Sequence, residues 1–165
     1  MKTKELCKKS ISLVVSVLML VSMLSGMSIT AIAETSGDYE YTVLTDGTAE
    51  ITKYTGTAAD LTIPSTLNDI TVTSIGRQAF ESCGSLTNVV IPDTVTNIGY
   101  YSFGYCDNLA TISIPASVEN INKTSFNQSE NITNISVDAE NANYSSQRKQ
   151  QKLKPTRAIN HSQKQ

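Results

Sequence analysis

An internal repeat is the feature that most constrains the fold of this chain. Residues 86–108 read LTNVVIPDTVTNIGYYSFGYCDN, and residues 109–131 read LATISIPASVENINKTSFNQSEN. The two segments have equal length and match at their apolar positions and at one proline, and Phe80, Phe103 and Phe126 recur with the same period. A unit this short cannot bury its apolar face alone, so the fixed period predicts that successive units stack on one another.

Partial copies precede and follow the two complete units. The earlier copy contains Pro64, and a later copy begins at Ile132. The spacing from Pro64 to Pro92 is longer than that from Pro92 to Pro115, because the first unit carries five extra residues within 67–74. We call one unit of the repeat a coil, and we expect about three coils plus a partial one over residues 63–146.

The pattern inside each coil predicts short strands joined by turns. In the motif L-x-x-[VI]-x-I the last two apolar positions alternate with solvent-side positions, which is the period of a strand with one buried face. Proline ends this strand, because it has no N–H to donate to a neighbouring strand. The next motif, V-x-x-I-G, predicts a second extended segment followed by a turn, because Gly76 or Gly99 permits a turn that other residues would resist. The motif [AS]-F-x-x-C predicts a helical turn that directs Phe and Cys inward. We therefore expect a right-handed, β-rich solenoid of short stacked coils with helical turns.

Residues 34–62 predict a β cap at the N-terminal end of the stack. Tyr39, Tyr41 and Val43 alternate with more polar residues, and the turn sequence Asp46-Gly47 follows them. This combination is typical of a β-hairpin. We expect the hairpin to lead into the first coil.

The repeat resembles the BspA-type leucine-rich repeats of bacterial surface proteins. The resemblance covers about residues 38–146 and rests on the two complete units and on partial units at 61–85 and 132–136. It implies a leucine-rich-repeat solenoid with a strand-rich N-terminal cap. It also implies an exported protein that attaches cells to host matrix, host cells or other bacteria, without catalytic activity.

Residues 1–33 have the pattern of a secretory signal peptide. A lysine-rich start is followed by an apolar run over 11–29 and by Ala31-Ile32-Ala33, so we expect cleavage before Glu34. The alternative is an uncleaved membrane anchor, because the run approaches the ~20 residues that span a bilayer. Serines within the run and the A-x-A motif favour cleavage. The expected mature protein is secreted or attached to the cell surface and is not embedded in the membrane.

Residues 147–165 depart from the repeat. This segment carries six basic residues and no acidic one, and it has no repeat positions. Its composition predicts a disordered basic tail. Because family members normally continue with more coils or a capping segment, a truncation or frameshift near Ser146 is one interpretation. A basic anchor that contacts anionic wall polymers is the other.

Charge and residue content argue against several classes of function. Residues 34–140 hold fourteen acidic residues against three basic ones, whereas a nucleic-acid-binding domain carries a basic surface. The only histidine, His161, lies in the tail, so no Ser/His/Asp or Cys/His arrangement is available to the repeat. Two carboxylates brought together by folding could still support glycosidase chemistry, but the repeat offers no pocket for it. We expect no enzyme activity, no cofactor and no metal site.

Cys83 and Cys106 occupy the same position in neighbouring coils. Export favours a disulfide between them. Side chains that point in parallel directions are, however, poorly placed for the dihedral angle of a disulfide. The interpretation we favour is that both are buried thiols that act as small apolar side chains.

The candidate binding residues are the solvent-side positions of the predicted strands. They form a shallow, polar and nearly uncharged strip, which consists of Thr62, Asn88, Val90, Thr111, Ser113, Asn134 and Ser136. Solenoid faces of this kind bind extended partners. Ser and Thr also suit the solvent side of a strand without any binding role.

A tyrosine cluster is the second candidate site. Tyr100, Tyr101 and Tyr105 lie close together on the turn side of one coil. Their rings could stack on sugars, or they could only shield the edge of the coil.

These features predict adhesion or partner binding, with a protein or a glycan as the ligand. A structural spacer that binds nothing is one alternative. An accessory domain of a secreted carbohydrate-active enzyme is another.

Overall fold

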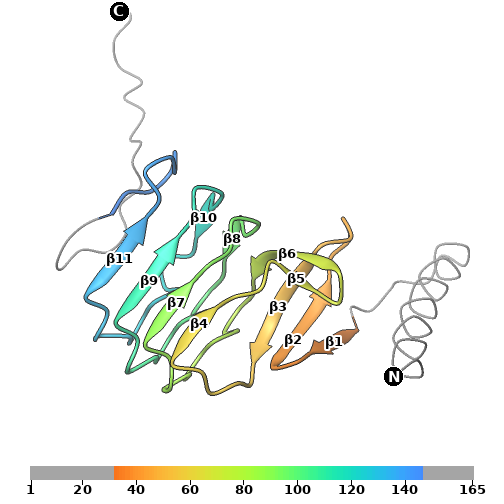
Figure 1. Ribbon diagram of the computed structural model, residues 1–165, viewed down its shortest axis with the longest axis horizontal. Coiled ribbons are helices and arrows are strands. Elements are labelled where there is room, and N and C mark those ends of the chain that lie inside the picture. The colour runs from red at the N-terminus through yellow and green to blue at the C-terminus, as the bar shows by residue number, and fades with distance from the viewer. Residues whose placement is uncertain (1–31, 147–165) are drawn as a thin grey trace, which may run out of the picture. The chain divides into compact units, whose positions relative to one another are not determined.

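The computed structural model describes residues 32–146, which form a β-solenoid of about four turns (Figure 1). This confirms the predicted solenoid. The export signal predicted over 1–33 falls almost wholly outside the described residues, and so does the basic tail predicted over 147–165. The described part consists of strands and turns, and it contains no helix long and apolar enough to cross a bilayer.

The first of two sheets contains one strand from each coil, and we call it the front sheet. Its four strands are arranged in the order β11-β9-β7-β4, and every neighbouring pair is parallel. The strands are β4 (Asp60–Thr62), β7 (Asn88–Val90), β9 (Thr111–Ile114) and β11 (Asn134–Val137). Thr111 pairs with Asn88 and with Asn134, so the period of the sequence repeat sets the register of the sheet.

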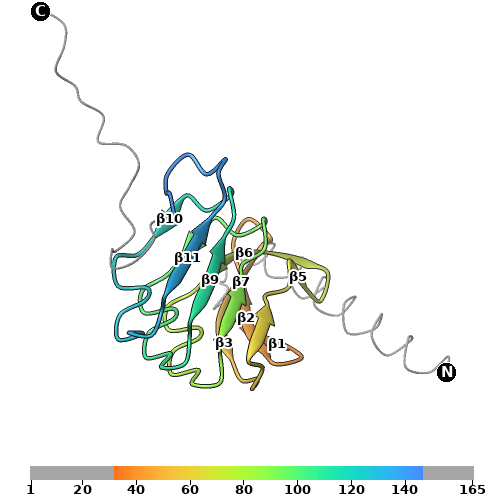
Figure 2. The ribbon, with the colours of Figure 1, turned by 60° about the vertical axis from the view of Figure 1, so that its left-hand side comes forward.

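The second sheet, here the rear sheet, runs along the other side of the coils (Figure 2). Its main path is β1-β2-β3-β6-β8-β10. The strands of this path are β1 (Ala33–Ser36), β2 (Tyr39–Val43), β3 (Ala49–Tyr54), β6 (Ile70–Ile75), β8 (Asn97–Ile98) and β10 (Asn120–Ile121). The pairs from β3 to β10 are parallel, as stacked coils require.

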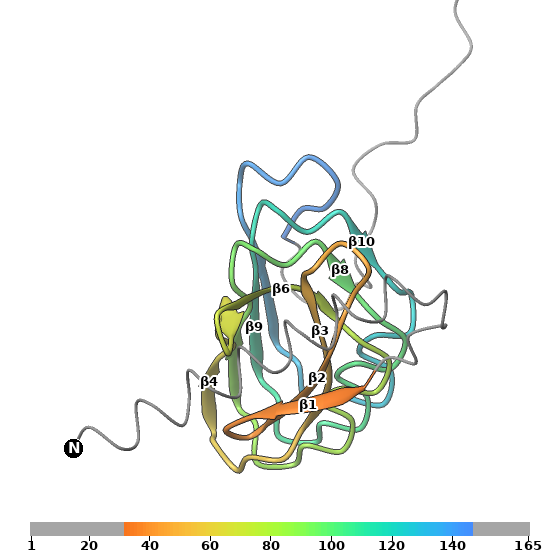
Figure 3. The same cartoon turned by 90° about the vertical axis from the view of Figure 1, so that its right-hand side faces the viewer.

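Strands β1, β2 and β3 form the N-terminal cap. They pair antiparallel with one another, and β3 then joins the stack by pairing parallel with β6. Figure 3 shows β1 and β2 at the N-terminal end of the coils. The cap thus has one more strand than a simple hairpin. Strand β4 lies in the range predicted for the cap but is already part of the front sheet.

The five extra residues of the first unit form a small hairpin. Strand β5 (Thr66–Leu67) pairs antiparallel with the start of β6. Asn68 and Asp69 join them with φ angles of 47° and 67°. A two-residue turn with positive φ at both positions is a common hairpin connection, and Asn and Asp tolerate it better than most residues. The insertion therefore leaves the register of the later coils unchanged.

An aromatic column runs through the core along the stack. The rings of Phe103 and Phe126 lie 5.7 Å apart with planes 14° from parallel, and Phe80 and Phe103 are stacked in the same way. Tyr54 continues the column into the cap, because its ring lies 5.3 Å from that of Phe80. Phe80 and Phe103 are fully buried, whereas Phe126 in the last coil is only partly buried. The predicted stacking of coils is therefore present.

The predicted helical turns are wrong. The segments that contain Phe80, Phe103 and Phe126 form successive turns, and the described residues contain no helix. The reason is that their backbone N–H groups bond between coils, as in Phe80 N to Ser102 O at 2.8 Å and Phe103 N to Ser125 O at 2.8 Å. Residues with positive φ, such as Tyr101 and Tyr105, also interrupt any helical run.

Cys83 and Cys106 carry free thiols. The Cys106 thiol donates to the carbonyl oxygen of Phe80 at 3.1 Å. Ser129 holds the same position in the next coil, and its hydroxyl donates to the carbonyl oxygen of Phe103 at 2.6 Å. Burial raises the pKa of the Cys106 thiol to about 12, so the group is protonated at neutral pH. Cys106 is thus a buried side chain that links one coil to the previous one.

Three polar side chains cover the backbone of the last coil. Asn141 occupies the place that Val118 holds in the previous coil, and its amide donates to the carbonyl oxygens of Val118 and Pro115 at 3.1 and 2.8 Å. The Tyr144 hydroxyl accepts the N–H of Ile121 at 2.9 Å, and the Ser146 hydroxyl accepts the N–H of Val137 at 2.7 Å. Both N–H groups belong to strands at the ends of their sheets. Residues 138–146 therefore cover part of the edge that would otherwise pair with a further coil.

Candidate binding surfaces

The predicted strip lies on the outer side of the front sheet, and we call it the front strip. The pairing register divides it into two columns that run across the strands. One column contains Asn88, Thr111 and Asn134, and the other contains Thr62, Val90, Ser113 and Ser136. Alternating residues such as Val89 and Ile112 point into the core and are 1% exposed. The structure therefore brings all seven predicted residues together on one face.

Hydrogen bonds link the side chains of the first column. The Asn88 amide donates to the carboxylate of Asp60, and the Thr111 hydroxyl donates to the amide oxygen of Asn88. Asp60 was missing from the predicted strip. It pairs with Asn88 at the same longer spacing that relates Thr62 to Val90, so the offset of the first unit was the signal that could have found it.

The second column is more available to a partner. Thr62, Ser113 and Ser136 are exposed, and within the described residues their hydroxyl groups make no hydrogen bond. Val90 lies between Thr62 and Ser113 and is 44% exposed, more than any other large aliphatic side chain of the described residues except Ile32. The second column is exposed and uncharged, and hydroxyl groups lie on either side of its one apolar side chain. It can therefore bind an uncharged surface without desolvating a charge.

The tyrosine cluster lies in the turns that lead from β8 of the rear sheet to β9 of the front sheet. The rings of Tyr100 and Tyr101 lie 4.5 Å apart, and those of Tyr101 and Tyr105 lie 6.0 Å apart. The guanidinium of Arg77, from the previous coil, lies 4.9 Å from the centre of the Tyr100 ring. Tyr100 and Tyr105 are 42% and 46% exposed, so the cluster is an accessible aromatic surface.

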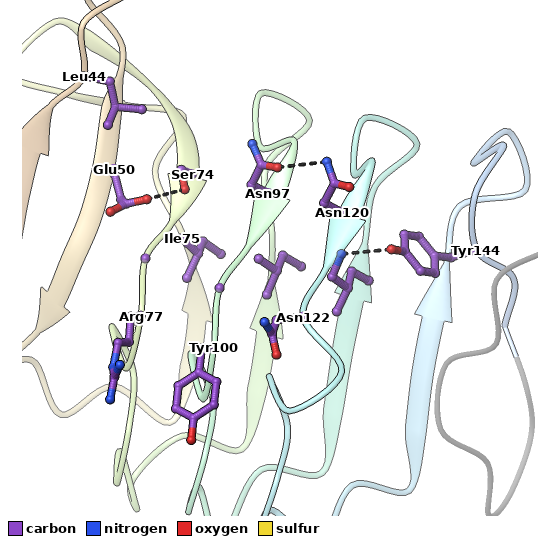
Figure 4. Close-up of a pocket in the computed structure, with 14 residues that line it drawn as sticks. Leu44, Glu50, Ser74, Ile75, Arg77, Asn97, Tyr100, Asn120, Asn122 and Tyr144 are labelled. Carbon is purple, nitrogen blue, oxygen red and sulfur yellow. Dashed lines mark hydrogen bonds between the residues drawn. The ribbon is translucent and has the colours of Figure 1, made fainter.

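An open groove of about 630 Å³ follows the rear sheet beside Tyr100 (Figure 4). One wall is a row of polar side chains from four paired strands, namely Glu50, Ser74, Asn97 and Asn120. Ser74 donates to Glu50 at 2.7 Å, and the Asn120 amide donates to the Asn97 amide oxygen at 3.0 Å. We call this surface the rear groove.

Gly76 and Gly99 also line the rear groove, and Arg77, Tyr100 and Asn122 lie on its other side (Figure 4). A Cβ atom on Gly76 would lie 2.7 Å from the carbonyl oxygen of Ile51, and one on Gly99 would lie 2.8 Å from the backbone of Gly76. Neighbouring coils thus approach so closely that only glycine fits. The sequence motif V-x-x-I-G indicated a turn here, and the groove itself was not predicted.

Ionisable groups are sparse on both surfaces. Within residues 32–146, no three His, Cys, Asp or Glu side chains come close enough to hold a metal ion. Hydrogen bonds from Thr48 lower the pKa of Asp46, which lies in a turn of the cap and belongs to neither surface. The chemistry that the two surfaces offer is hydrogen bonding and apolar contact.

The sequence profile of the BspA type leucine rich repeat region matches residues 50–148, in six copies. Among solved structures, the chain is similar to a leucine-rich repeat protein of T. pallidum, with 27% identity and a TM-score of 0.59. Similar leucine-rich repeat proteins of Bacteroides capillosus and Bacteroides ovatus share 27% and 28% identity, each with a TM-score of 0.51. A comparison with curated proteins gives no match.

The matches cover the repeat and differ in how much of each relative they include. They extend over 63%, 65% and 66% of this chain for the T. pallidum, B. capillosus and B. ovatus proteins. The chain spans about half of the T. pallidum protein (49%), nearly all of the B. capillosus protein (99%) and 28% of the B. ovatus protein.

Proposed function

Because the chain belongs to the BspA-type leucine-rich repeat family, we propose that it is an exported binding protein. In this proposal the mature protein acts outside the cell and holds a protein or glycan partner on the front strip, as an adhesin does. The proposal assigns it no catalytic activity. Its support is the family, the signal-like sequence of residues 1–33 and the geometry of the front strip.

The single observation that carries the proposal is the exposed second column of the front strip. Thr62, Val90, Ser113 and Ser136 come from four adjacent strands, and they are held in register by the ladder of the front sheet. Adjacent strands are about 4.8 Å apart, so the column offers regularly spaced contacts to an extended partner. Because the column is part of a paired sheet, binding requires little ordering of the protein.

Lysine substitution tests the proposal. Ser113→Lys and Ser136→Lys each place a long charged side chain in the column, while Ala116→Lys adds the same charge to an exposed turn of the same coil as Ser113. The exported form would be tested against immobilised host matrix proteins and wall glycans. We expect the two strip variants to weaken binding about tenfold or more, and the turn variant to bind like the wild type.

The alternatives give other results. If the strip variants bind as well as the wild type, a spacer that binds nothing through this face is the better description. If the parent gene also encodes a catalytic domain for glycans, the role of an accessory domain gains support.

A further inference from the structure

We infer that the rear groove is a second binding site, and that its ligand is an uncharged, linear polysaccharide of pyranose units. The groove lies on the opposite sheet from the front strip, so this inference goes beyond the proposed function and concerns different residues. It stands on three features of the groove: an amide wall, an aromatic wall and a stretch between coils that two glycines line with backbone.

The amide wall offers hydrogen bonds of the kind that sugar hydroxyls need. Asn97 and Asn120 sit at the same position of successive coils, and both side chains are exposed. One bond between them, of 3.0 Å, fixes their orientation and leaves the Asn120 amide oxygen without a partner within the described residues. A primary amide has two N–H donors and an acceptor oxygen. It can therefore donate to one hydroxyl of a sugar and accept from the next.

The aromatic wall suits the apolar side of the same ligand. Arg77 and Tyr101 both pack on the Tyr100 ring, with centre distances of 4.9 and 4.5 Å, so its orientation is fixed before a ligand arrives. The ring remains 42% exposed and borders the groove (Figure 4). A pyranose ring has hydroxyl groups around its edge and C–H groups on its faces. An amide row on one side and an aromatic surface on the other match these two parts.

The glycine-lined stretch and the period of the coils suit a linear chain of such rings. Gly76 and Gly99 line the groove with backbone alone, beside the buried Ile75 and Ile98. Successive coils are about 4.8 Å apart, which is similar to the advance of one pyranose unit linked through its 1 and 4 positions. Asn97 and Asn120 lie one coil apart, so two successive sugars would each meet an amide of this row.

Charge and pairing argue against other ligands. Among the described residues, Glu50 is the only acid that lines the groove, and Arg77 already packs on an aromatic ring, so these side chains offer no cluster of charge to a phosphate or an acidic polymer. Strands β6 and β8 are paired on both sides, so a peptide cannot extend the sheet inside the groove. An uncharged polymer with many hydroxyl groups fits the amide row and the aromatic ring that line the groove.

The test uses the full chain and isothermal titration with cellohexaose and chitohexaose. We expect at least one of these hexasaccharides to bind. We expect the double variant Asn97→Ala, Asn120→Ala to weaken that binding about tenfold or more. Asn120→Asp, which keeps the shape and removes the donors, is expected to weaken it as well. The matched control Ala116→Lys lies in an exposed turn that belongs neither to the rear groove nor to the front strip, and it is expected to leave hexasaccharide binding unchanged.

Circular dichroism would verify that each variant is folded before titration, and Asn120→Asp provides the test if the double variant is unfolded. The inference is overturned if neither hexasaccharide binds, or if folded groove variants bind as well as the wild type. It is also overturned if Ala116→Lys abolishes the binding, or if an uncharged glycine-serine hexapeptide displaces the sugar. The proposed function is tested with front-strip variants and the rear groove with groove variants, so the two proposals can fail independently.

Discussion

The phenyl rings of Phe80 and Phe103 lie 4.9 Å apart, with planes only 11° from parallel, although the two residues belong to successive units of the sequence repeat. Both side chains are fully buried. Each ring is covered by the equivalent ring of the next coil, so a single coil has no core of its own. Stability is therefore shared between neighbours, as expected for a repeat protein.

The first prediction concerns this column. Phe103→Ala removes a ring that is stacked on both sides, and we expect it to lower the free energy of unfolding by about 3–5 kcal/mol. Phe126→Ala removes a ring that is only partly buried, so its effect should be clearly smaller. Urea unfolding followed by circular dichroism measures both. If the two variants lost the same free energy of unfolding, Phe126 would be as well covered as Phe103, which would contradict its place at the end of the column.

The second prediction concerns the distance between coils. Gly99→Ala places a Cβ atom 2.8 Å from the backbone of Gly76, so neighbouring coils must move apart, and we expect a loss of about 1–3 kcal/mol. Gly84→Ala is the matched control, because a Cβ atom there has open space around it. Thermal unfolding should separate the two. A Gly99→Ala protein as stable as the Gly84→Ala protein would show that the coils are not packed as closely as described.

The third prediction concerns the end of the stack. Asn141→Val restores the valine found at the equivalent position of earlier coils, and a simple repeat argument would expect stabilisation. We expect a loss of about 1–3 kcal/mol instead, because the buried Asn141 amide bonds to the carbonyl oxygens of Pro115 and Val118. Its oxygen also accepts the N–H groups of Asn143 and Tyr144. A gain in the urea midpoint would refute the capping role.

The fourth prediction concerns alkaline pH. Burial raises the pKa of the Cys106 thiol from 9.0 to about 12, so the folded protein keeps this proton while the unfolded chain loses it near 9. The contribution of Cys106 to stability is therefore complete below about pH 8 and is lost as the pH rises from 9 towards 12. Burial also raises the pKa of Tyr41 from 10.0 to about 12, which acts in the same direction.

Cys106→Ser tests this fourth prediction, because Ser129 shows that serine can make the same bond in the next coil. Urea midpoints would be compared between about pH 8 and about pH 10.5. We expect the wild type to lose more stability than the variant over that range, by up to about 1.4 kcal/mol for each pH unit above the thiol pKa of the unfolded chain. Parallel losses in the two proteins would argue that Cys106 titrates normally.

Much of the fold follows from the repeat in the sequence. The spacing of Phe80, Phe103 and Phe126 predicted the stack, and the alternation around Val89 and Ile112 predicted which side chains face solvent. Both predictions depend on the period of the sequence. That period can be recognised without knowing any individual contact. The front strip was found in this way.

Features that break the period were not predictable in the same way. The motif [AS]-F-x-x-C suggested a helical turn, but hydrogen bonds to the next coil override that local preference. The cap at Asn141 was missed because one polar residue in a valine column has no signature until its partners are known. The rear groove was missed because it arises where strands of different coils meet. Gly76 and Gly99 were interpreted only as turn residues, whereas the close approach of neighbouring coils also requires glycine there.

A crystal structure that includes residues 34–146 is the measurement that tests the central claim most directly. The account predicts that the rings of Phe80, Phe103 and Phe126 form one column, with Ser113 and Ser136 side by side on the outer face of the front sheet. If the three rings are far apart or face solvent, the coils do not shield one another. The front strip would then have no sheet to hold it.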